Sequence, residues 1–358
     1  MTNVLHVDFP ARQRSRAARI EALMAQVATC RRGPEDVFWL KENAELLNVL
    51  ECTVAKPDAG GIAHYGAFYE EIGRRIAFFP QYYRFFLSLC LDLEDLGLPG
   101  TKGEALCAWV ADRGLAGAEL SDLQRAEARR LCLRRGVDPL SADQGLDDRL
   151  RAFARRTETF ALPNKKAAYE LTHIVFYLSE YGRRDPNVDD EIALSLHHAG
   201  TLAFLELNID LLSEVCIALR FARRTPPPQW EAWLADQAMR FRVSAAGPGA
   251  APADDYHPWL MLNWLMALSD RGGFAHEMPE GTVLFAAPAP AAGPLRELSD
   301  SIYRMGGHRS PHWPEMRERV GESLSDAALA VLEAAETAVD FNIFFRGFAR
   351  ASQPGIAS

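Results

Sequence analysis

Apolar residues recur along most of this chain at spacings of three and four, the period of an α-helix with one buried face. The first such stripe consists of Ile20, Leu23, Met24 and Val27. At most one short strand is predicted, at 283–286, because alternating apolar and polar residues are otherwise almost absent. Helices are predicted at 11–30, 42–50, 65–79, 82–96, 103–113, 119–135, 146–160, 165–181, 189–224, 229–243 and 325–350, with a further helix that begins after Asp255.

Proline and glycine mark the ends of these helices and the loops between them. Pro80 ends one helix, and the three prolines at 226–228 end the long stretch from 189, since a proline ring lacks the N–H that a helix interior needs. Two segments rich in Gly, Ala and Pro, 245–253 and 281–294, are predicted to be loops.

The resulting pattern predicts an all-α protein with a single domain over 16–350 and a flexible N-terminal arm at 1–15. No fixed-period repeat is evident in the sequence. Helices of this length and number pack either as an irregular multi-helix bundle or as antiparallel pairs that close into an α/α toroid. Both arrangements place a cavity where inner helix faces converge, so functional polar residues are expected there.

Composition restricts the class of partner. The chain has 39 basic and 48 acidic residues and a net charge of -9, which argues against a nucleic-acid surface and against an anionic membrane. Its six cysteines show no metal-binding spacing, and no secretory signal or long apolar run is present, so a cytoplasmic location is expected. No Gly-rich phosphate loop, HExxH or GxSxG motif occurs.

The most informative stretch is 192–219, which contains no Lys or Arg but carries Glu206, Asp210 and Glu214. On one continuous helix these three carboxylates lie at successive i, i+4 positions and share a face. Like charges at this spacing repel one another unless a proton, a metal ion or a basic group intervenes. The alternative is a solvated face, or one paired with arginines of a neighbouring helix. His197 and His198 lie just upstream, and at most one of them can share that face.

A second cluster lies at 169–181. Tyr169, His173 and Tyr177 recur at i, i+4, and Glu170 with His173 forms a Glu-x-x-His spacing that presents a carboxylate and an imidazole to one site. This face can hold a metal ion or an acid–base pair. The motif occurs once, whereas dinuclear carboxylate bundles need it twice. The alternative is a core histidine hydrogen-bonded by a neighbour.

A third cluster follows Asp254 and Asp255, where His257 is expected in the first turn of a helix. The positive end of the helix dipole disfavours the imidazolium there, so a neutral imidazole is predicted, suited to act as a base or a ligand. The alternative is a structural residue at the helix start, covered by Trp259.

Together, Tyr-Glu-x-Thr-His-x-x-Phe-Tyr at 169–177, Asn-x-Asp-Leu-x-x-Glu at 208–214 and Tyr-His at 256–257 resemble the signature of an uncharacterised family of bacterial all-helical proteins, some encoded near natural-product genes. The resemblance covers roughly 165–270, with a weaker echo at 39–45. It implies a helical fold whose polar residues gather in one cavity, and it implies no particular reaction.

These clusters predict a cytoplasmic enzyme that acts on a small polar or peptide-derived metabolite by acid–base or metal-assisted chemistry. His173 and His257 are the candidate proton-transfer groups, and Tyr177 is a candidate hydroxyl donor. Asp210 and Glu214 are expected to orient them or to bind a cationic substrate group. The candidate ligands for one divalent metal ion are Glu170, His173, Asp210, Glu214 and His257.

The alternative function is a helical binding or scaffold protein. Aromatic residues gather in the segments 82–86 and 341–345, and an exposed aromatic surface of this kind mediates association with a partner or with a second copy of the chain. Two outcomes distinguish these functions. Convergence of the side chains of His173, Asp210, Glu214 and His257 on one cavity favours the enzyme, whereas their separation on different surfaces favours the scaffold.

Overall fold

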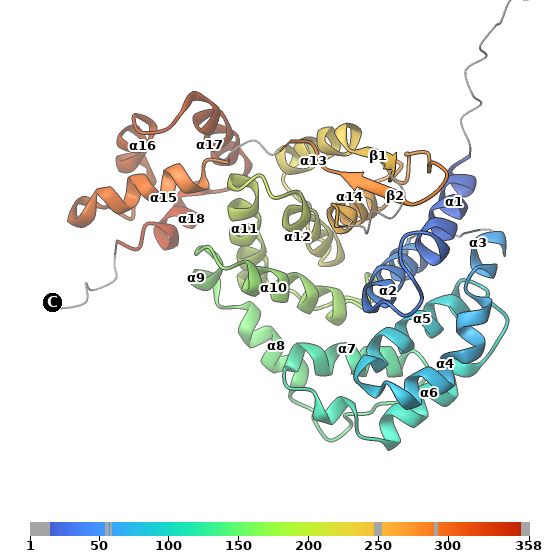
Figure 1. The fold of residues 1–358 in the computed structure, drawn as a ribbon. Helices are drawn as coiled ribbons and strands as arrows, with labels where there is room; N and C mark the ends of the chain where they lie inside the picture. Colours follow the sequence, from blue (N-terminus) through green and yellow to red (C-terminus); the bar gives the residue numbers. More distant parts are fainter. Residues whose placement is uncertain (1–14, 54–56, 58, 247–252, 290–292, 352–358) are drawn as a thin grey trace, which may run out of the picture.

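The structure, a computed structural model, is almost entirely helical (Figure 1). It describes residues 15–53, 57, 59–246, 253–289 and 293–351. Within these residues there are 18 α-helices and one pair of short strands, so the all-α prediction is confirmed. The predicted N-terminal arm falls outside the described residues except for Ser15, the N-cap of the first helix.

Most consecutive helices are joined by short connections, and the longest connection, between α14 and α15, contains β2. The first ten are α1 (Arg16–Thr29), α2 (Val37–Cys52), α3 (Ala59–Ala63), α4 (Gly66–Phe78), α5 (Tyr83–Asp95), α6 (Lys102–Asp112), α7 (Asp122–Leu133), α8 (Leu146–Ala154), α9 (Thr157–Phe160) and α10 (Lys165–Leu178). The remaining helices are α11 (Asp190–Leu205), α12 (Ile209–Phe221), α13 (Pro228–Arg240), α14 (Tyr256–Leu268), α15 (Leu295–Arg304), α16 (Trp313–Gly321), α17 (Asp326–Ala338) and α18 (Phe341–Phe348). Strands β1 (Arg242–Ala245) and β2 (Val283–Ala286) pair antiparallel, which confirms the predicted strand.

Polar residues that precede the helices cap their free N–H groups. The side-chain oxygen of Asn164 accepts a hydrogen bond from the Ala167 N–H at the start of α10, and Asn208 accepts one from Leu211 at the start of α12. Ser325 caps α17, as the sequence predicts. Each such cap stabilises a helix by about 1 kcal/mol. The two asparagine caps fix where α10 and α12 begin, and these two helices carry most of the candidate site.

The single helix predicted at 189–224 is wrong, because the chain forms two helices there. α11 ends before Glu206, and Leu207 has a φ of 55°, a left-handed conformation that cannot continue a helix. Asn208 then starts α12. The chain therefore turns between Glu206 and the other two carboxylates of the predicted stripe.

Several other predicted helices are interrupted or shorter than expected, and the one predicted at 146–160 is divided into α8 and α9. The helix predicted at 325–350 is interrupted, since α17 ends at Ala338 and Asp340 caps a separate helix, α18. The helix predicted at 229–243 ends at Arg240, because the following residues form β1 and their backbone groups pair with β2.

Six helices form a closed ring in the middle of the molecule, which can be followed in Figure 1. α2 packs against α5, α5 against α7, α7 against α10, α10 against α12, and α12 against α14, which returns to α2. At this closure the Tyr256 hydroxyl of α14 donates to the Glu42 carbonyl of α2 at 3.1 Å. The arrangement agrees with the toroid-like alternative, and its inner faces surround a cavity.

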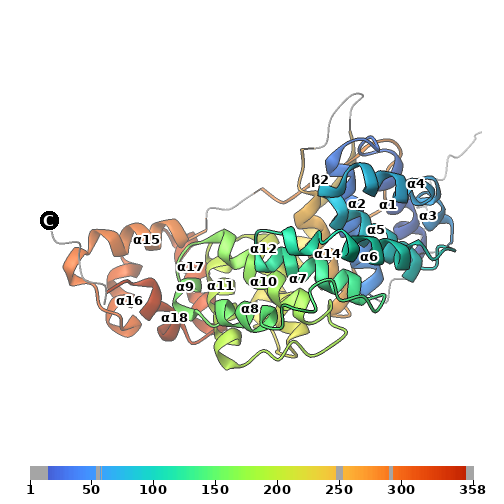
Figure 2. The ribbon, with the colours of Figure 1, turned by 90° about the horizontal axis from the view of Figure 1, so that it is seen from below.

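The C-terminal helices α15–α18 lie at one end of the molecule and α1–α6 at the other (Figures 1 and 2). α17 packs against α11 and α13, two helices outside the ring that in turn pack against α12 of the ring. None of the helices in the described part of the chain is both long and apolar enough to cross a membrane.

The two aromatic segments contribute mainly to the interior. In 341–345 all three phenylalanines are buried, and in 82–86 the side chains of Tyr83 and Phe86 are buried. The large aromatic surface that the scaffold alternative requires is therefore not formed by these segments. They fill the C-terminal helical group and the packing around α5 instead.

One carboxylate with a side chain only 7% exposed, Glu94, ties α5 to α4, to α6 and to the segment that follows α7. It accepts hydrogen bonds from the Tyr69 hydroxyl at 2.6 Å, the Gly103 N–H at 2.8 Å and the Arg135 guanidinium at 2.9 Å. Burial alone raises the pKa of Glu94, but these donors outweigh burial and lower the pKa below its ordinary value. The stabilisation is therefore present above the unfolded-state pKa and is lost as pH falls through the folded-state pKa.

We expect Glu94→Gln to lower the free energy of unfolding by about 1.5 to 3 kcal/mol at pH 7, the range for hydrogen bonds to charged groups. The difference from wild type should disappear toward pH 3. Urea unfolding followed by circular dichroism at several pH values measures it, with Glu70→Gln as the control because the Glu70 carboxylate is 75% exposed. A deficit that stays constant with pH contradicts the assignment of this stability to the ionised carboxylate.

Candidate active-site cavity

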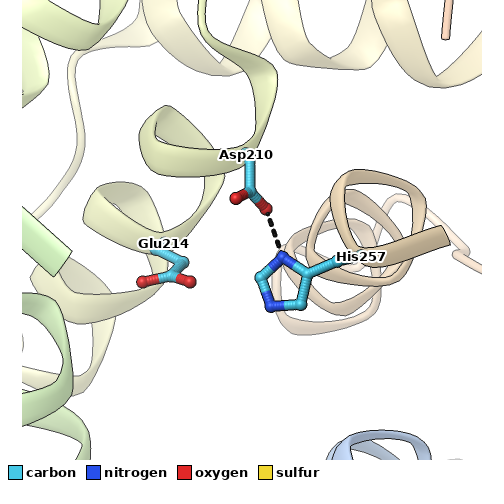
Figure 3. Close-up of side chains that lie close together, drawn as sticks. All are labelled: Asp210, Glu214 and His257. Atoms are coloured by element: carbon cyan, nitrogen blue, oxygen red, sulfur yellow. Dashed lines mark hydrogen bonds and ion pairs between the residues drawn. The ribbon is translucent and has the colours of Figure 1, made fainter. Parts of the chain in front are cut away.

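Helix α12 supplies two carboxylates to the candidate site (Figure 3). Because Asn208 caps the helix, Asp210 lies in its first turn and Glu214 one turn further on. This i, i+4 pair is the part of the predicted acidic stripe that lies on one helix. The Glu214 side chain is 1% exposed and accepts a hydrogen bond of 2.6 Å from the Thr172 hydroxyl of α10.

His257 reaches the same place from the first turn of α14, as predicted. Its Nδ1 lies 2.8 Å from Oδ1 of Asp210, the contact drawn in Figure 3, and its Nε2 lies 3.7 Å from Oε1 of Glu45 on α2. The carboxylates of the preceding Asp254 and Asp255 accept N–H groups of β2 and the residue after it, each at 2.8 Å. The start of α14, and with it the imidazole, is thus held in place by β2.

The charge on His257 differs from the prediction. Burial acts against the imidazolium, but the hydrogen bond to Asp210 and the charges of Glu45 and Glu214 outweigh burial and raise the pKa of His257 from 6.5 to about 9. The predicted neutral imidazole is therefore wrong for the metal-free protein. Three nearby carboxylates influence the ring more strongly than the helix dipole does.

The three carboxylates around His257 are not equivalent. Burial raises the pKa of Glu214 and of Glu45 by more than the neighbouring histidines lower it. Burial acts on Asp210 in the same direction, but hydrogen bonds from His257 and from the Tyr169 hydroxyl, the latter at 2.7 Å, lower its pKa below the ordinary value. The cluster therefore holds one firmly ionised carboxylate and two that resist ionisation without a further cation.

Helix α10 brings Tyr169, His173 and Tyr177 to the site on successive turns, as predicted. Nδ1 of His173 lies 2.8 Å from the Tyr169 carbonyl oxygen, which can only accept, so the ring donates from Nδ1 and keeps the lone pair on Nε2 in its neutral form. The same Nδ1 lies 3.6 Å from Oε2 of Glu214. The Tyr177 ring meets the imidazole edge-on, with ring centroids 5.8 Å apart.

Asp210, Glu214 and His257 can hold a metal ion. Each offers one ligand atom, and these atoms lie within 4.8 Å of one another. Ligands on one divalent ion stand about 3 to 4 Å apart, so a small side-chain movement completes the site. A mixed carboxylate and imidazole set suits Zn²⁺, Fe²⁺ or Mn²⁺, and three protein ligands leave positions for water or substrate. The residues present therefore fit one divalent metal ion.

A cavity of about 210 Å³ lies inside the ring beside these groups, with wall residues from all six ring helices. Glu45, His173, Tyr177, Glu214 and His257 line it. Four of these five come from the predicted clusters, so residues from three separate segments converge on one cavity. The separate-surfaces outcome expected of a scaffold is not what the structure contains.

A larger hollow of about 430 Å³ lies outside this cluster. Its basic wall consists of Arg184, Arg220, Arg223 and Arg224. Each of these guanidinium groups is within ion-pair distance of a carboxylate, so their charge is already compensated. The group of convergent ionisable side chains lies in the smaller cavity, which is the better candidate site.

Two carboxylates considered from the sequence lie elsewhere. Glu170 is 4.0 Å from Lys166, one turn away on α10, and is not among the described residues that line the cavity, so the predicted pairing of Glu170 with His173 in a metal site is not supported. Glu206 pairs with Lys165 at 2.9 Å. Both carboxylates have a lysine partner, in contrast to Glu214.

His197 and His198 also lie away from the site, because α11 is not part of the ring. The His197 ring packs near Trp230, and the His198 ring packs near Phe344. Burial lowers the pKa of both histidines. They are neutral core residues.

Sequence reasoning missed several residues of the cavity wall, including the charged Glu45, Arg84, Glu127 and Arg130. A weak signal for Glu45 existed, since it ends the 39–45 segment that carries the fainter echo of the family pattern. Arg130 lies in a basic stretch of α7 and resembles any surface arginine in sequence. Its position becomes visible only when α7 packs against α10.

Comparison with protein families matches residues 1–351 to a domain of unknown function, DUF6902. Comparisons with curated proteins and with solved structures found no match. The family description names no activity, so the chemistry of the cavity has to carry the functional argument.

Proposed function

The chain belongs to the DUF6902 family, and from the geometry of its cavity we propose that it is a cytoplasmic enzyme that binds one divalent metal ion through Asp210, Glu214 and His257. Its substrate is a small polar or peptide-derived metabolite that occupies the ring cavity. The observation that carries the proposal is the convergence of these three ligand groups from two helices within 4.8 Å of one another. Glu214 and His257 line the ring cavity, and Asp210, hydrogen-bonded to His257, lines a neighbouring hollow.

Charge balance supports a cation at this position. Three carboxylates, Glu45, Asp210 and Glu214, surround His257, and burial opposes the ionisation of two of them. Lys41 provides some compensation, since its ammonium lies 3.7 Å from Glu45. A divalent ion offsets the remaining repulsion and allows all three carboxylates to be ionised together.

The chain's own residues supply the remaining functions. His173 keeps its Nε2 lone pair available and lines the cavity, so it can take or return a substrate proton. The Tyr177 hydroxyl is a donor in the same wall, and Tyr169 holds Asp210 in place through its hydrogen bond. When bound, a divalent ion supplies polarisation of a substrate oxygen or activation of a water molecule.

One observation favours a second candidate, metal-free acid–base catalysis. The Asp210–His257 hydrogen bond of 2.8 Å orients the imidazole, and a pKa of about 9 keeps it protonated at neutral pH. His257 then serves as a general acid and His173 as the base. The same cavity and a substrate of the same class are used in both mechanisms.

Metal analysis separates the two candidates. We expect purified wild type, or apoprotein titrated with Mn²⁺, Fe²⁺ or Zn²⁺, to hold about one equivalent of metal, as a three-ligand site does. The double variant Asp210→Ala, His257→Ala should hold less than about a tenth of that amount, because two ligands are lost. Removing both partners of the hydrogen bond avoids leaving one of them buried alone.

Glu206→Gln is the matched control, since it removes a carboxylate of the same predicted stripe that pairs with Lys165 outside the cavity. It should retain the full metal content. Cooperative thermal unfolding verifies that each variant is folded. A wild type that binds none of the three ions, or a double variant that keeps its metal, contradicts the metal site and leaves acid–base catalysis as the better candidate.

A further inference from the structure

Arg130 on α7 is a buried cation with unused hydrogen-bond donors. The residue is 4% exposed, and its buried Nε and Nη1 have no hydrogen-bond partner among the described residues. It lines the same cavity as Glu214 and His257. In the ring, α7 and α14 are separated by two helices in either direction, so Arg130 and His257 lie on opposite members of the ring.

The surroundings of Arg130 do not neutralise its charge by direct pairing. Its guanidinium carbon lies over the rings of Tyr181 and Tyr177, at 4.3 and 5.3 Å from their centroids. The nearby Glu127 is bonded to Arg84. Among the described residues no carboxylate lies within ion-pair distance of Arg130. The faces of the two tyrosine rings and the more distant charges of Glu127 and Glu180 offset part of its charge.

An arrangement of this kind is costly in a structure that serves no ligand. Buried polar groups are hydrogen-bonded in the great majority of cases, and a buried charge is normally paired. Arginine also presents planar N–H donors that match the geometry of a carboxylate. A cavity wall with free guanidinium donors is therefore suited to an anionic ligand.

We propose that Arg130 binds a carboxylate group of the substrate inside the ring cavity. The inference rests on the proposed function, because it concerns the same cavity, and it narrows the substrate to a small carboxylic acid. The anionic end lies between Tyr177 and Tyr181 on the Arg130 side. The reacting end faces His173, Glu214 and His257.

The volume of the cavity limits the size of this acid. The cavity volume of about 210 Å³ lies below the roughly 300 to 1,000 Å³ of sites that hold drug-sized ligands. Short acids with few non-hydrogen atoms beyond the carboxylate fill this space, whereas a long peptide or a nucleotide does not.

Metal-free protein tests the proposal without relying on the metal site. Straight-chain monocarboxylates of two to six carbons and the matching primary amides are added to chelator-treated, dialysed wild type, and the melting temperature is measured. We expect at least one acid to raise the melting temperature by about 2 °C or more when present at ten times its Kd. The matching amide has no charge and should give no shift.

The variants Arg130→Met and Arg130→Lys identify where the acid binds. In Arg130→Met the shift should vanish, and in Arg130→Lys it should be reduced, because the charge remains and the planar donors are lost. The melting temperature of ligand-free Arg130→Met should equal or exceed that of wild type, since an unpaired buried charge is removed. Metal content of all three proteins should be the same when metal is restored.

Three results overturn the proposal: no probe acid stabilises wild type, an acid stabilises Arg130→Met as strongly as wild type, or ligand-free Arg130→Met melts well below wild type as expected of a purely structural arginine. If wild type binds no metal but its melting temperature rises with an acid in the way described, the proposed metal site is overturned and the binding of a carboxylate by Arg130 is retained. If wild type binds metal but no acid raises its melting temperature, the role of Arg130 is overturned and the metal site is retained. The two failures are therefore distinguishable.

Discussion

Replacement of Arg31 by methionine is expected to lower the free energy of unfolding by about 3 to 5 kcal/mol, the cost of breaking a buried ion pair from one side. Arg31 follows α1 and is 3% exposed. It donates to Glu42 of α2 at 3.2 and 3.3 Å and to Asp254, ahead of α14, at 3.0 Å through each of two nitrogens. The substitution leaves Glu42 and Asp254 buried without this partner.

The effect should extend to the candidate site, because Arg31 also fixes the start of α14. It donates to the Val283 carbonyl of β2 and lies over the ring of Tyr256, 4.8 Å from its centroid. The Asp254 carboxylate also accepts a hydrogen bond from the Phe285 N–H of β2. Loss of Arg31 therefore loosens the turn that carries His257, and weaker metal binding should accompany the loss of stability.

Urea unfolding of the full chain measures this change in the free energy of unfolding. Arg31→Lys should be intermediate, because it keeps the charge and loses the forked donors. Arg74→Met is the matched control: the Arg74 side chain is 78% exposed, its ion pair to Glu71 lies on the surface, and a change within about 0.5 kcal/mol is expected. A loss below about 1 kcal/mol in Arg31→Met contradicts the role assigned to this network.

The helical class and the pairing of Asp210 with Glu214 on one helix face were predictable because both depend on local spacing. Apolar periodicity predicts helices wherever one face is buried, and Asp210 with Glu214 shares a face on any helix that contains both. The position of His257 in a first turn followed from the two aspartates that precede it. These features are determined by residues within one or two helical turns of each other in the sequence.

Features set by tertiary packing were not predictable in the same way. The helix break at Leu207 has no proline or glycine to mark it, so Glu206 was grouped with carboxylates from which the chain turns away. The charge of His257 depends on Glu45, more than two hundred residues distant in sequence. Arg130 is an ordinary helical arginine until α7 closes the ring. Which residues line the cavity depends on how the ring helices pack, and this packing depends on contacts between helices that are distant in sequence.

Replacement of Glu214 by glutamine should change metal affinity and apoprotein stability in opposite directions. Loss of a ligand carboxylate is expected to weaken metal binding by about 100-fold or more. The metal-free variant should nevertheless be more stable than metal-free wild type at pH 8, because it removes a buried carboxylate whose ionisation burial opposes. The amide keeps an oxygen that can accept the Thr172 hydroxyl, so this hydrogen bond survives.

The sign of the stability change follows from the pKa of Glu214, which burial raises above its ordinary value. A group with a raised folded-state pKa favours the folded state below its unfolded-state pKa, and this contribution is lost as pH rises through the folded-state pKa. Ionised Glu214 therefore lowers the free energy of unfolding of the metal-free protein at high pH. The advantage of the glutamine variant should grow with rising pH and vanish toward pH 4.

Isothermal titration with Mn²⁺ and urea unfolding of the same chelator-treated samples measure the two effects together. Saturating metal should reverse the order, since wild type at 100 times its Kd gains about 2.7 kcal/mol from binding, a gain that the variant lacks at the same concentration. Glu206→Gln should match wild type in both measurements. If metal-free Glu214→Gln is less stable than wild type at every pH, the result contradicts the metal site. It would mean that the Glu214 carboxylate stabilises the fold by packing and hydrogen bonding, whereas a carboxylate that serves to bind a cation destabilises the protein when the cation is absent.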